Sequence, residues 1–274
     1  MSASGHAAAR PNRHPALLGA LGLGVTFIPI CASDARLAPL AVIPLGLLAG
    51  VISWGVSNIR SGVFLRSFHH GDRARAEITL TFDDGPDPEW TPRVLTELAA
   101  RKVRATFFVI GRRAARHPEL VARIVAEGHE VGLHTFDHEL TYTVRSSRFV
   151  RDDLARSREV LSAAGAPPPR WYRPPNGLLN PRIAREAWRA GLDIAGWTVR
   201  PFDGVAASPD LIVERVASVV DRGDVVLLHD ARSPHGSTHA PPGVAALPRI
   251  LDAIEARGLV PVPLGELASL ARWP

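Results

Sequence analysis

The feature that most constrains the fold is a regular alternation of short apolar runs with helical patterns over the last two thirds of the chain. Such runs are typical of buried strands. They lie at residues 78–82, 105–110, 131–133, 194–197 and 225–228. Helices between them have start signals, a capping side chain before a proline, at Thr91-Pro92, Asn180-Pro181 and Ser208-Pro209. Repeated strand-then-helix units predict an α/β fold whose parallel sheet is closed, or nearly closed, as a barrel.

Two uncharged stretches precede this pattern, at residues 15–33 and 37–59, and neither contains Asp, Glu, Lys or Arg. A bilayer core of about 30 Å needs about 20 apolar helical residues, so each stretch is long enough to span it. We therefore expect an N-terminal tail and a two-helix transmembrane hairpin within residues 1–60, a linker at 61–76, and a folded domain at 77–274. A cleaved signal peptide and a buried core hairpin are the alternatives.

Arginine placement predicts how this hairpin is oriented, because Arg and Lys near the ends of a span favour the cytoplasmic side. One arginine, Arg36, lies in the turn between the stretches, whereas several lie on the outer flanks: Arg10, Arg13, Arg60, Arg66, Arg73 and Arg75. We therefore expect a protein of the inner (cytoplasmic) membrane whose folded domain faces the cytoplasm.

The charge composition excludes one class of partner. The chain has 32 Lys+Arg against 27 Asp+Glu, and Lys102 is its only lysine. No dense basic stretch is interleaved with aromatic residues, so nucleic acid is not an expected partner. No obligate protein partner is evident, and the single cysteine, Cys31, excludes an intrachain disulfide.

Polar residues follow three of the apolar runs directly. Asp83 and Asp84 follow the first run, His134 follows the third, and His229 follows the last. Functional groups of parallel barrels gather at the C-terminal ends of strands, so we expect these side chains to share one site. Neighbouring carboxylates in a regular strand point to opposite sides. The turn at Gly85-Pro86 would allow both to reach one pocket from different angles.

His134 and His138 have the spacing of metal ligands. Residues four apart on a helical turn lie on one face, within reach of one ion. Two imidazoles and one carboxylate leave coordination positions open, which is the pattern of a catalytic metal site. Zinc is the expected ion, although the same ligands accept cobalt, nickel or iron. A solvated helix face would also explain the histidine pair, and a plain turn would explain Asp-Asp-Gly-Pro.

Five motifs in this order resemble the NodB-type polysaccharide deacetylases, carbohydrate esterase family four, from about Glu77 to the C-terminus. The resemblance implies a distorted (β/α) barrel as the catalytic domain. It also implies removal of acetyl groups from N-acetylated, or sometimes O-acetylated, sugars of a glycan substrate. The motifs are Thr81–Pro86, His134–His138, Arg173–Gly177, Trp197–Asp203 and Leu227–His229.

The resemblance also implies roles for individual residues. Asp84, His134 and His138 would ligate the metal, Asp83 would be the general base, and His229 the general acid. Arg173 would pair with the base and Asp203 with the acid, and the oxyanion would be stabilised by the backbone amide that here belongs to Asn176. Other positions match the family's substrate pocket, although core packing would explain an apolar residue there equally well: Pro174, Trp197 and Leu227.

Two departures from the family's motifs put the choice of sugar in doubt. Asn176 stands where the family commonly has an aromatic residue, and Arg200–Gly204 stands where its fourth motif often reads Asp-x-x-Asp-Trp. Both changes remove an aromatic face for stacking on a sugar. His235 and His239 lie in a stretch rich in Pro and Gly, where a loop over the pocket is expected rather than a second metal site.

Two other functions compete with this interpretation. A glycosidase would use Asp83 with a second carboxylate, but it would leave the histidines at ligand spacing unexplained. The alternative outside enzymology is a membrane-tethered carbohydrate-binding protein with a decayed deacetylase site.

Overall fold

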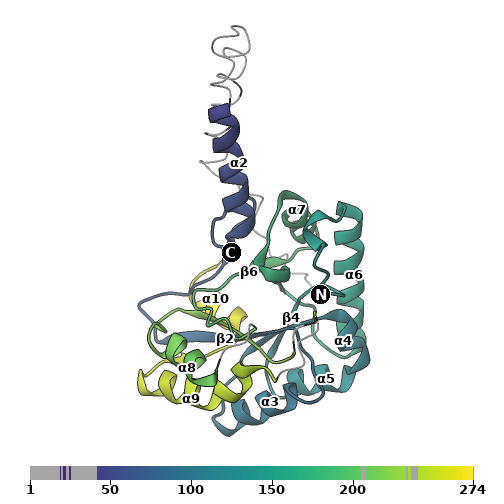
Figure 1. Ribbon diagram of the computed structural model, residues 1–274. Coiled ribbons are helices and arrows are strands. Elements are labelled where there is room, and N and C mark those ends of the chain that lie inside the picture. Colours follow the sequence, from purple (N-terminus) through teal and green to yellow (C-terminus); the bar gives the residue numbers. More distant parts are fainter. Residues whose placement is uncertain are drawn as a thin grey trace.

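The computed structural model describes residues 42–204, 208–232, 234–235 and 240–273, together with Gly19, Leu21, Gly22 and Val25. A curled sheet of eight strands lies at the centre of this part, in the order β1-β6-β5-β4-β3-β2-β7, with β8 paired to β2 (Figure 1). Every strand pair is parallel. The strands are β1 (Ser67–Phe68), β2 (Glu77–Asp83), β3 (Thr106–Val109), β4 (Glu130–Leu133), β5 (Trp171–Tyr172), β6 (Asp193–Ala195), β7 (Val225–His229) and β8 (Val260–Pro261).

Helices connect the strands and cover the outside of the sheet (Figure 1). Helix α2 differs, because it projects away from the sheet and from the other helices. The helices are α2 (Val42–Ser57), α3 (Thr91–Ala100), α4 (Gly111–Arg116), α5 (Pro118–Ala126), α6 (Ser147–Ala163), α7 (Pro181–Arg189), α8 (Pro209–Ala217), α9 (Pro242–Ala256) and α10 (Leu264–Leu270), with short 3-10 turns η2 (Tyr142–Val144) and η3 (Pro175–Gly177).

Two of the three expected caps form. Asn180 accepts backbone hydrogen bonds at the start of α7, and Ser208 does so at the start of α8. The expectation for Thr91 is wrong, because α3 begins at Thr91 itself and Trp90 occupies the cap position. The Thr91 hydroxyl instead donates to the buried carboxylate of Asp230, so a tertiary contact replaces the local cap.

Strands β1 to β7 are buried on both faces over nearly all of their length, as the continuous apolar runs predict for a parallel sheet, whereas β8 is partly exposed. Successive side chains alternate between two cores: Phe107 belongs to the core under the outer helices, and Phe108 belongs to a smaller core inside the curl. Helix α10 closes this inner core with Leu264 and Leu267. Because the inner core fills the interior, polar side chains reach open space only at the strand ends.

The sheet curls enough to bring its outer strands toward each other. Single bridges link His70 to Asp224 and Val199 to Val226, so the segments that follow β1 and β6 reach β7. The prediction of an α/β fold with a parallel sheet is therefore confirmed, and the sheet curls into a half-barrel.

The predicted membrane hairpin is covered only in part. Helix α2 has 16 residues and lies within the second expected span, 37–59. The first span, 15–33, lies outside the described residues apart from Gly19, Leu21, Gly22 and Val25. No helix in the described part of the chain combines the length and apolar character needed to cross a bilayer. The hairpin stays a prediction.

Candidate active site

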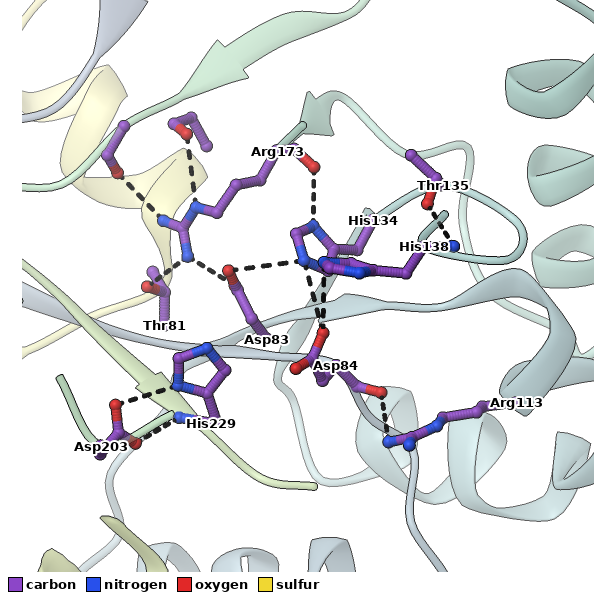
Figure 2. A network of polar contacts seen from close by, with 12 residues as sticks. Thr81, Asp83, Asp84, Arg113, His134, Thr135, His138, Arg173, Asp203 and His229 are labelled. Atoms are coloured by element: carbon purple, nitrogen blue, oxygen red, sulfur yellow. Dashed lines mark hydrogen bonds and ion pairs between the residues drawn. The ribbon is translucent and has the colours of Figure 1, made fainter. Parts of the chain in front are cut away.

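A cavity of about 140 Å³ opens where β2, β4 and β7 end, and polar side chains from all three strand ends converge on it (Figure 2). The aspartates at the end of β2, the histidines after β4 and the histidine at the end of β7 all line it: Asp83, Asp84, His134, His138 and His229. The structure thus brings together the side chains expected at the C-terminal ends of the strands.

A change of backbone direction lets both aspartates reach the cavity. Phe82 belongs to the outer core, so Asp83, the next residue in β2, points inward. Asp84 has φ of 74°, in the left-handed region that Asp tolerates better than most residues. Arg113 donates to the Asp84 carbonyl oxygen at 2.9 Å and holds this turn. The two carboxylates therefore approach the cavity from different angles.

Asp84, His134 and His138 form a compact group, the ligand cluster. Asp84 Oδ1 lies 3.6 Å from His134 Nε2 and 3.7 Å from His138 Nε2, and the three ligand atoms lie within 4.8 Å of one another. Ligands of one tetrahedral zinc ion at 2.0–2.2 Å are about 3.4 Å apart. Asp84 Oδ1 is also buried without a hydrogen-bond partner in the described part of the chain. The donor set therefore fits a divalent metal.

The expected helical turn between the two histidines is absent. His134 and His138 lie on a loop in which Thr135 and His138 have φ of 64° and 53°. The Asp153 carboxylate on α6 accepts from the backbone N–H of Phe136 at 3.1 and 3.2 Å, and the Thr135 hydroxyl accepts from His138 N at 3.0 Å. These side chains accept hydrogen bonds from backbone groups that a helix would pair internally. The two imidazoles are therefore brought together by a loop and not by a helical turn.

Both imidazoles of the ligand cluster have one nitrogen held by a neighbour. His134 Nδ1 lies 2.7 Å from the Arg173 carbonyl, which can only accept, so Nδ1 carries the proton and Nε2 keeps its lone pair. His138 Nδ1 lies 3.1 Å from His235 Nε2. Burial lowers the pKa of His134, and burial followed by the charge of His235 lowers the pKa of His138 to about 4. Neutral imidazoles of this kind are the forms that bind metal.

Arg173 is completely buried and holds Asp83. Its guanidinium donates to Asp83 Oδ1 at 2.6 Å, to the Thr81 hydroxyl at 2.8 Å and to the Gly196 carbonyl at 3.0 Å. It also lies 4.1 Å from the centre of the Phe108 ring. Burial lowers the pKa of Arg173, and the charge of Asp83 opposes that shift. The expected pairing of Arg173 with Asp83 is present in the structure.

His229 and Asp203 form the second charged pair. His229 Nδ1 lies 2.9 Å from Asp203 Oδ1, and its backbone N–H donates to Asp203 Oδ2 at 2.8 Å. Burial by itself would lower the pKa of His229, but the charge and hydrogen bond of Asp203, followed by the charges of Asp84 and Asp83, raise it to about 10. These carboxylates therefore favour the protonated form of the His229 ring.

Three of the four expected substrate positions line the cavity, namely Asn176, Trp197 and Leu227. Asn176 lies in η3 with φ of 55°, a conformation that Asn adopts readily. Pro174 is buried and is not among the residues that line the cavity. It lies in extended backbone ahead of η3, and its assignment to substrate contact stays a prediction.

Three residues that support the site were not assigned a role from the sequence: Thr81, Arg113 and Asp153. Thr81 could have been found, because it lies two residues before Asp83 and so faces the same side of β2. Arg113 and Asp153 act on backbone groups of distant turns, which leaves no signal in the sequence. The expectation for His235 was a loop over the pocket, and the structure places it in the cavity wall.

Comparisons with known proteins agree with this geometry. Residues 70–195 match the family model described as polysaccharide deacetylase. The chain is 38% identical over 196 residues to a chitooligosaccharide deacetylase of Bradyrhizobium sp. (strain ANU 289), covering 69% of this chain and 90% of that protein. It is 36% identical over 192 residues to a peptidoglycan-N-acetylglucosamine deacetylase of Bacillus cereus, covering 69% and 87%. The crystal structure of the Bc1960 peptidoglycan N-acetylglucosamine deacetylase matches with a TM-score of 0.67 and 32% identity, covering 73% of this chain and 91% of that one.

Proposed function

The chain belongs to the polysaccharide deacetylase family, carbohydrate esterase family four, and from this premise we propose that it hydrolyses the acetamido groups of N-acetylated sugars in a metal-dependent reaction. Its class is that of hydrolases acting on carbon–nitrogen bonds other than peptide bonds. One observation carries the proposal: the ligand cluster lies in one small cavity beside the Arg173–Asp83 and His229–Asp203 pairs.

The ligand cluster supports a resident divalent metal, with zinc as the first choice. Such an ion would supply Lewis acidity and lower the pKa of a water molecule. The chain's own contribution is orientation: the Arg173 carbonyl fixes the ring of His134, and His235 contacts the ring of His138.

We assign Asp83 as the general base. Arg173 holds its Oδ1, while its Oδ2 lies 3.8 Å from His134 Nε2 and so faces the ligand cluster. A carboxylate held in this way can take a proton from a water molecule without reorienting. The same guanidinium restrains the side chain from turning away from the cavity.

We assign His229 as the general acid. Its Nδ1 is engaged by Asp203, which leaves Nε2 to protonate the leaving amine as the carbon–nitrogen bond breaks. The raised pKa keeps the ring in its acid form before that step. The backbone N–H of Asn176 would stabilise the oxyanion, the role that the family assigns to the amide after the two prolines.

The size of the cavity bears on the substrate. Its volume of about 140 Å³ is below the roughly 300–1,000 Å³ of pockets for drug-sized ligands, so it suits an acetamido group with the sugar ring at its mouth. Phe202, which is 49% exposed, also lines the cavity and offers an aromatic face to a sugar. The family commonly has such a face at the position of Asn176. The names of the relatives favour a chito-oligosaccharide or peptidoglycan as the substrate. A lipid-linked sugar is a third candidate, which no relative's name supports.

Acetate release measured on these three substrates and on an O-acetylated sugar tests the proposal. We expect release from at least one N-acetylated substrate, lost in Asp83→Asn and in enzyme stripped of metal. Full metal content without release from any substrate would favour the carbohydrate-binding alternative. Release that survives complete metal removal would contradict the proposed mechanism.

The membrane location is a separate proposal that rests on the uncharged stretches and their flanking arginines. We propose that the N-terminal segment anchors the protein in the inner membrane, with the catalytic domain on the cytoplasmic side. Reporter fusions to the C-terminus test this, since activity of a reporter that works only outside the cytoplasm would contradict the orientation.

A further inference from the structure

A second cavity lies at the base of α2, away from the ligand cluster. It is a groove of about 910 Å³ formed by the segment after α2 and by the end of α10, and no described residue lines both this groove and the catalytic cavity. Five arginines and one aspartate supply its charged side chains, and this set defines the basic groove: Arg60, Arg66, Arg73, Arg75, Arg272 and Asp72.

Three of these arginines have no carboxylate partner in the part of the chain that the structure describes. Arg73 pairs with Asp224 at 2.8 Å, and Arg75 pairs with Glu77 at the same distance. The other three are exposed, and no carboxylate of the described residues lies within ion-pair distance of them: Arg60, Arg66 and Arg272. Arg66 is held in place with its guanidinium 5.2 Å from the centre of the Trp273 ring.

The charges of Arg60 and Arg66 act on one side chain in the groove, His69. His69 lines the same groove, and its pKa is lowered first by burial and then, against a hydrogen bond with Ser67, by the charges of His70, Arg60 and Arg66. Asp72, the one carboxylate among the described residues that line the groove, accepts from the backbone N–H of Ala74, so it is engaged in its own turn. The groove therefore presents a concentrated positive field to solvent.

Helix α2 leads directly into the groove and exposes apolar side chains. It ends at Ser57, three residues before Arg60, and it projects away from the rest of the structure (Figure 1). Between 40% and 68% of the surface is exposed for six large residues: Val42, Ile43, Leu45, Leu47, Ile52 and Trp54. An apolar helix beside a basic groove matches a ligand with an anionic head and apolar chains.

We propose that the basic groove binds the phosphate of an anionic lipid headgroup while α2 lies along the lipid's acyl chains. The planar guanidinium groups of Arg60, Arg66 and Arg272 can each donate two hydrogen bonds to a phosphate. The exposed surface of α2 is what favours a lipid over a free phosphate. This inference is independent of the deacetylase reaction, because no residue in the described part of the chain lines both cavities.

Energy transfer from the protein's tryptophans to dansyl-labelled lipid tests the proposal. The full chain is held in uncharged detergent micelles that contain either phosphatidylglycerol or phosphatidylcholine, each dansyl-labelled on an acyl chain. We expect transfer to the anionic lipid well above that to the zwitterionic lipid. Each arginine near an anionic surface contributes about fivefold in affinity, so R60Q/R66Q/R272Q should weaken the anionic preference by about a hundredfold.

A matched control changes three exposed arginines on α3, α4 and α9, namely R93Q/R116Q/R249Q. It removes the same charge and should keep the preference, while circular dichroism verifies that both variants are folded. Equal transfer to the two lipids by the unaltered protein, or equal losses in the two variants, would overturn the proposal. Inorganic phosphate that displaces the anionic lipid at comparable concentration would show that the groove serves a soluble ligand, which also overturns it.

Discussion

The catalytic cavity and the basic groove both concentrate charge, but their charged side chains differ in burial and in pairing. The Arg173 side chain in the cavity is 0% exposed and is paired with Asp83, whereas the Arg73 side chain in the groove is 49% exposed. Three other arginines of the groove have no carboxylate partner in the described structure. Buried charges are screened little and exposed charges strongly. Single substitutions should therefore have large effects in the cavity, while the groove should respond in small additive steps.

Metal removal should produce the largest effect. Dialysis against a chelator removes the ion that the ligand cluster fits, so acetate release should fall to background and return when zinc is added. Metal content measured by mass spectrometry and acetate measured enzymatically provide the readouts. The basic groove should keep its preference for anionic lipid after metal removal. A loss of both acetate release and lipid preference would mean that the two sites are coupled.

Asp83→Asn should lower turnover by about two to four orders of magnitude, because the amide cannot take a proton from water. Single-turnover acetate release measures the effect, and Asp252→Asn, at an exposed carboxylate on α9, serves as the control. Near-normal turnover of Asp83→Asn with full metal content would rule out its assignment as the base.

Asp203→Asn should shift the pH profile. Asp203 raises the pKa of His229, so without its charge the ring loses its proton at lower pH and the alkaline limb of activity moves down. An opposite charge at this range shifts a pKa by about one to three units. The pH dependence of kcat/KM measures the limb, and an unchanged limb would show that His229 does not govern it.

Asp153→Ala should weaken metal binding by about ten- to a hundredfold, because the loop between His134 and His138 loses the acceptor for Phe136 N. Asp153→Asn keeps one acceptor oxygen and should restore part of the affinity. Competition with a chelating dye measures both. Asp152→Ala, at an exposed neighbour on α6, should change nothing; equal losses at the two positions would indicate a general effect on the helix.

Added salt should have the smallest effect, a gradual loss of binding to anionic lipid. Raising ionic strength from about 0.1 M to about 1 M shortens the screening length from about 10 Å to about 3 Å. Energy transfer from the tryptophans to dansyl-labelled anionic lipid should fall steadily over this range. Acetate release from an uncharged chito-oligosaccharide should change little. Equal sensitivity of the two activities would remove the contrast between the cavity and the groove.

Much of the fold was predictable from local pattern. The run at 225–228 became β7, and continuous apolar runs indicated a sheet buried on both faces. The order of the strands was not predictable, because β1 and β5 have only two residues each and their pairing depends on contacts far along the chain. The loop that carries His134 and His138 was mistaken for a helical turn, since its stabilising acceptor, Asp153, lies on another element.

The identity of the chemical groups, their order and their positions at strand ends are written in the sequence, because parallel strands place their C-terminal ends at one edge. Tertiary structure alone decided how those groups meet. Burial and pairing across distant segments set the charge state of His229 and the environment of Arg173. The basic groove is likewise a product of folding, because it joins residues 60–75 to residues 270–273 and no local pattern connects segments so far apart.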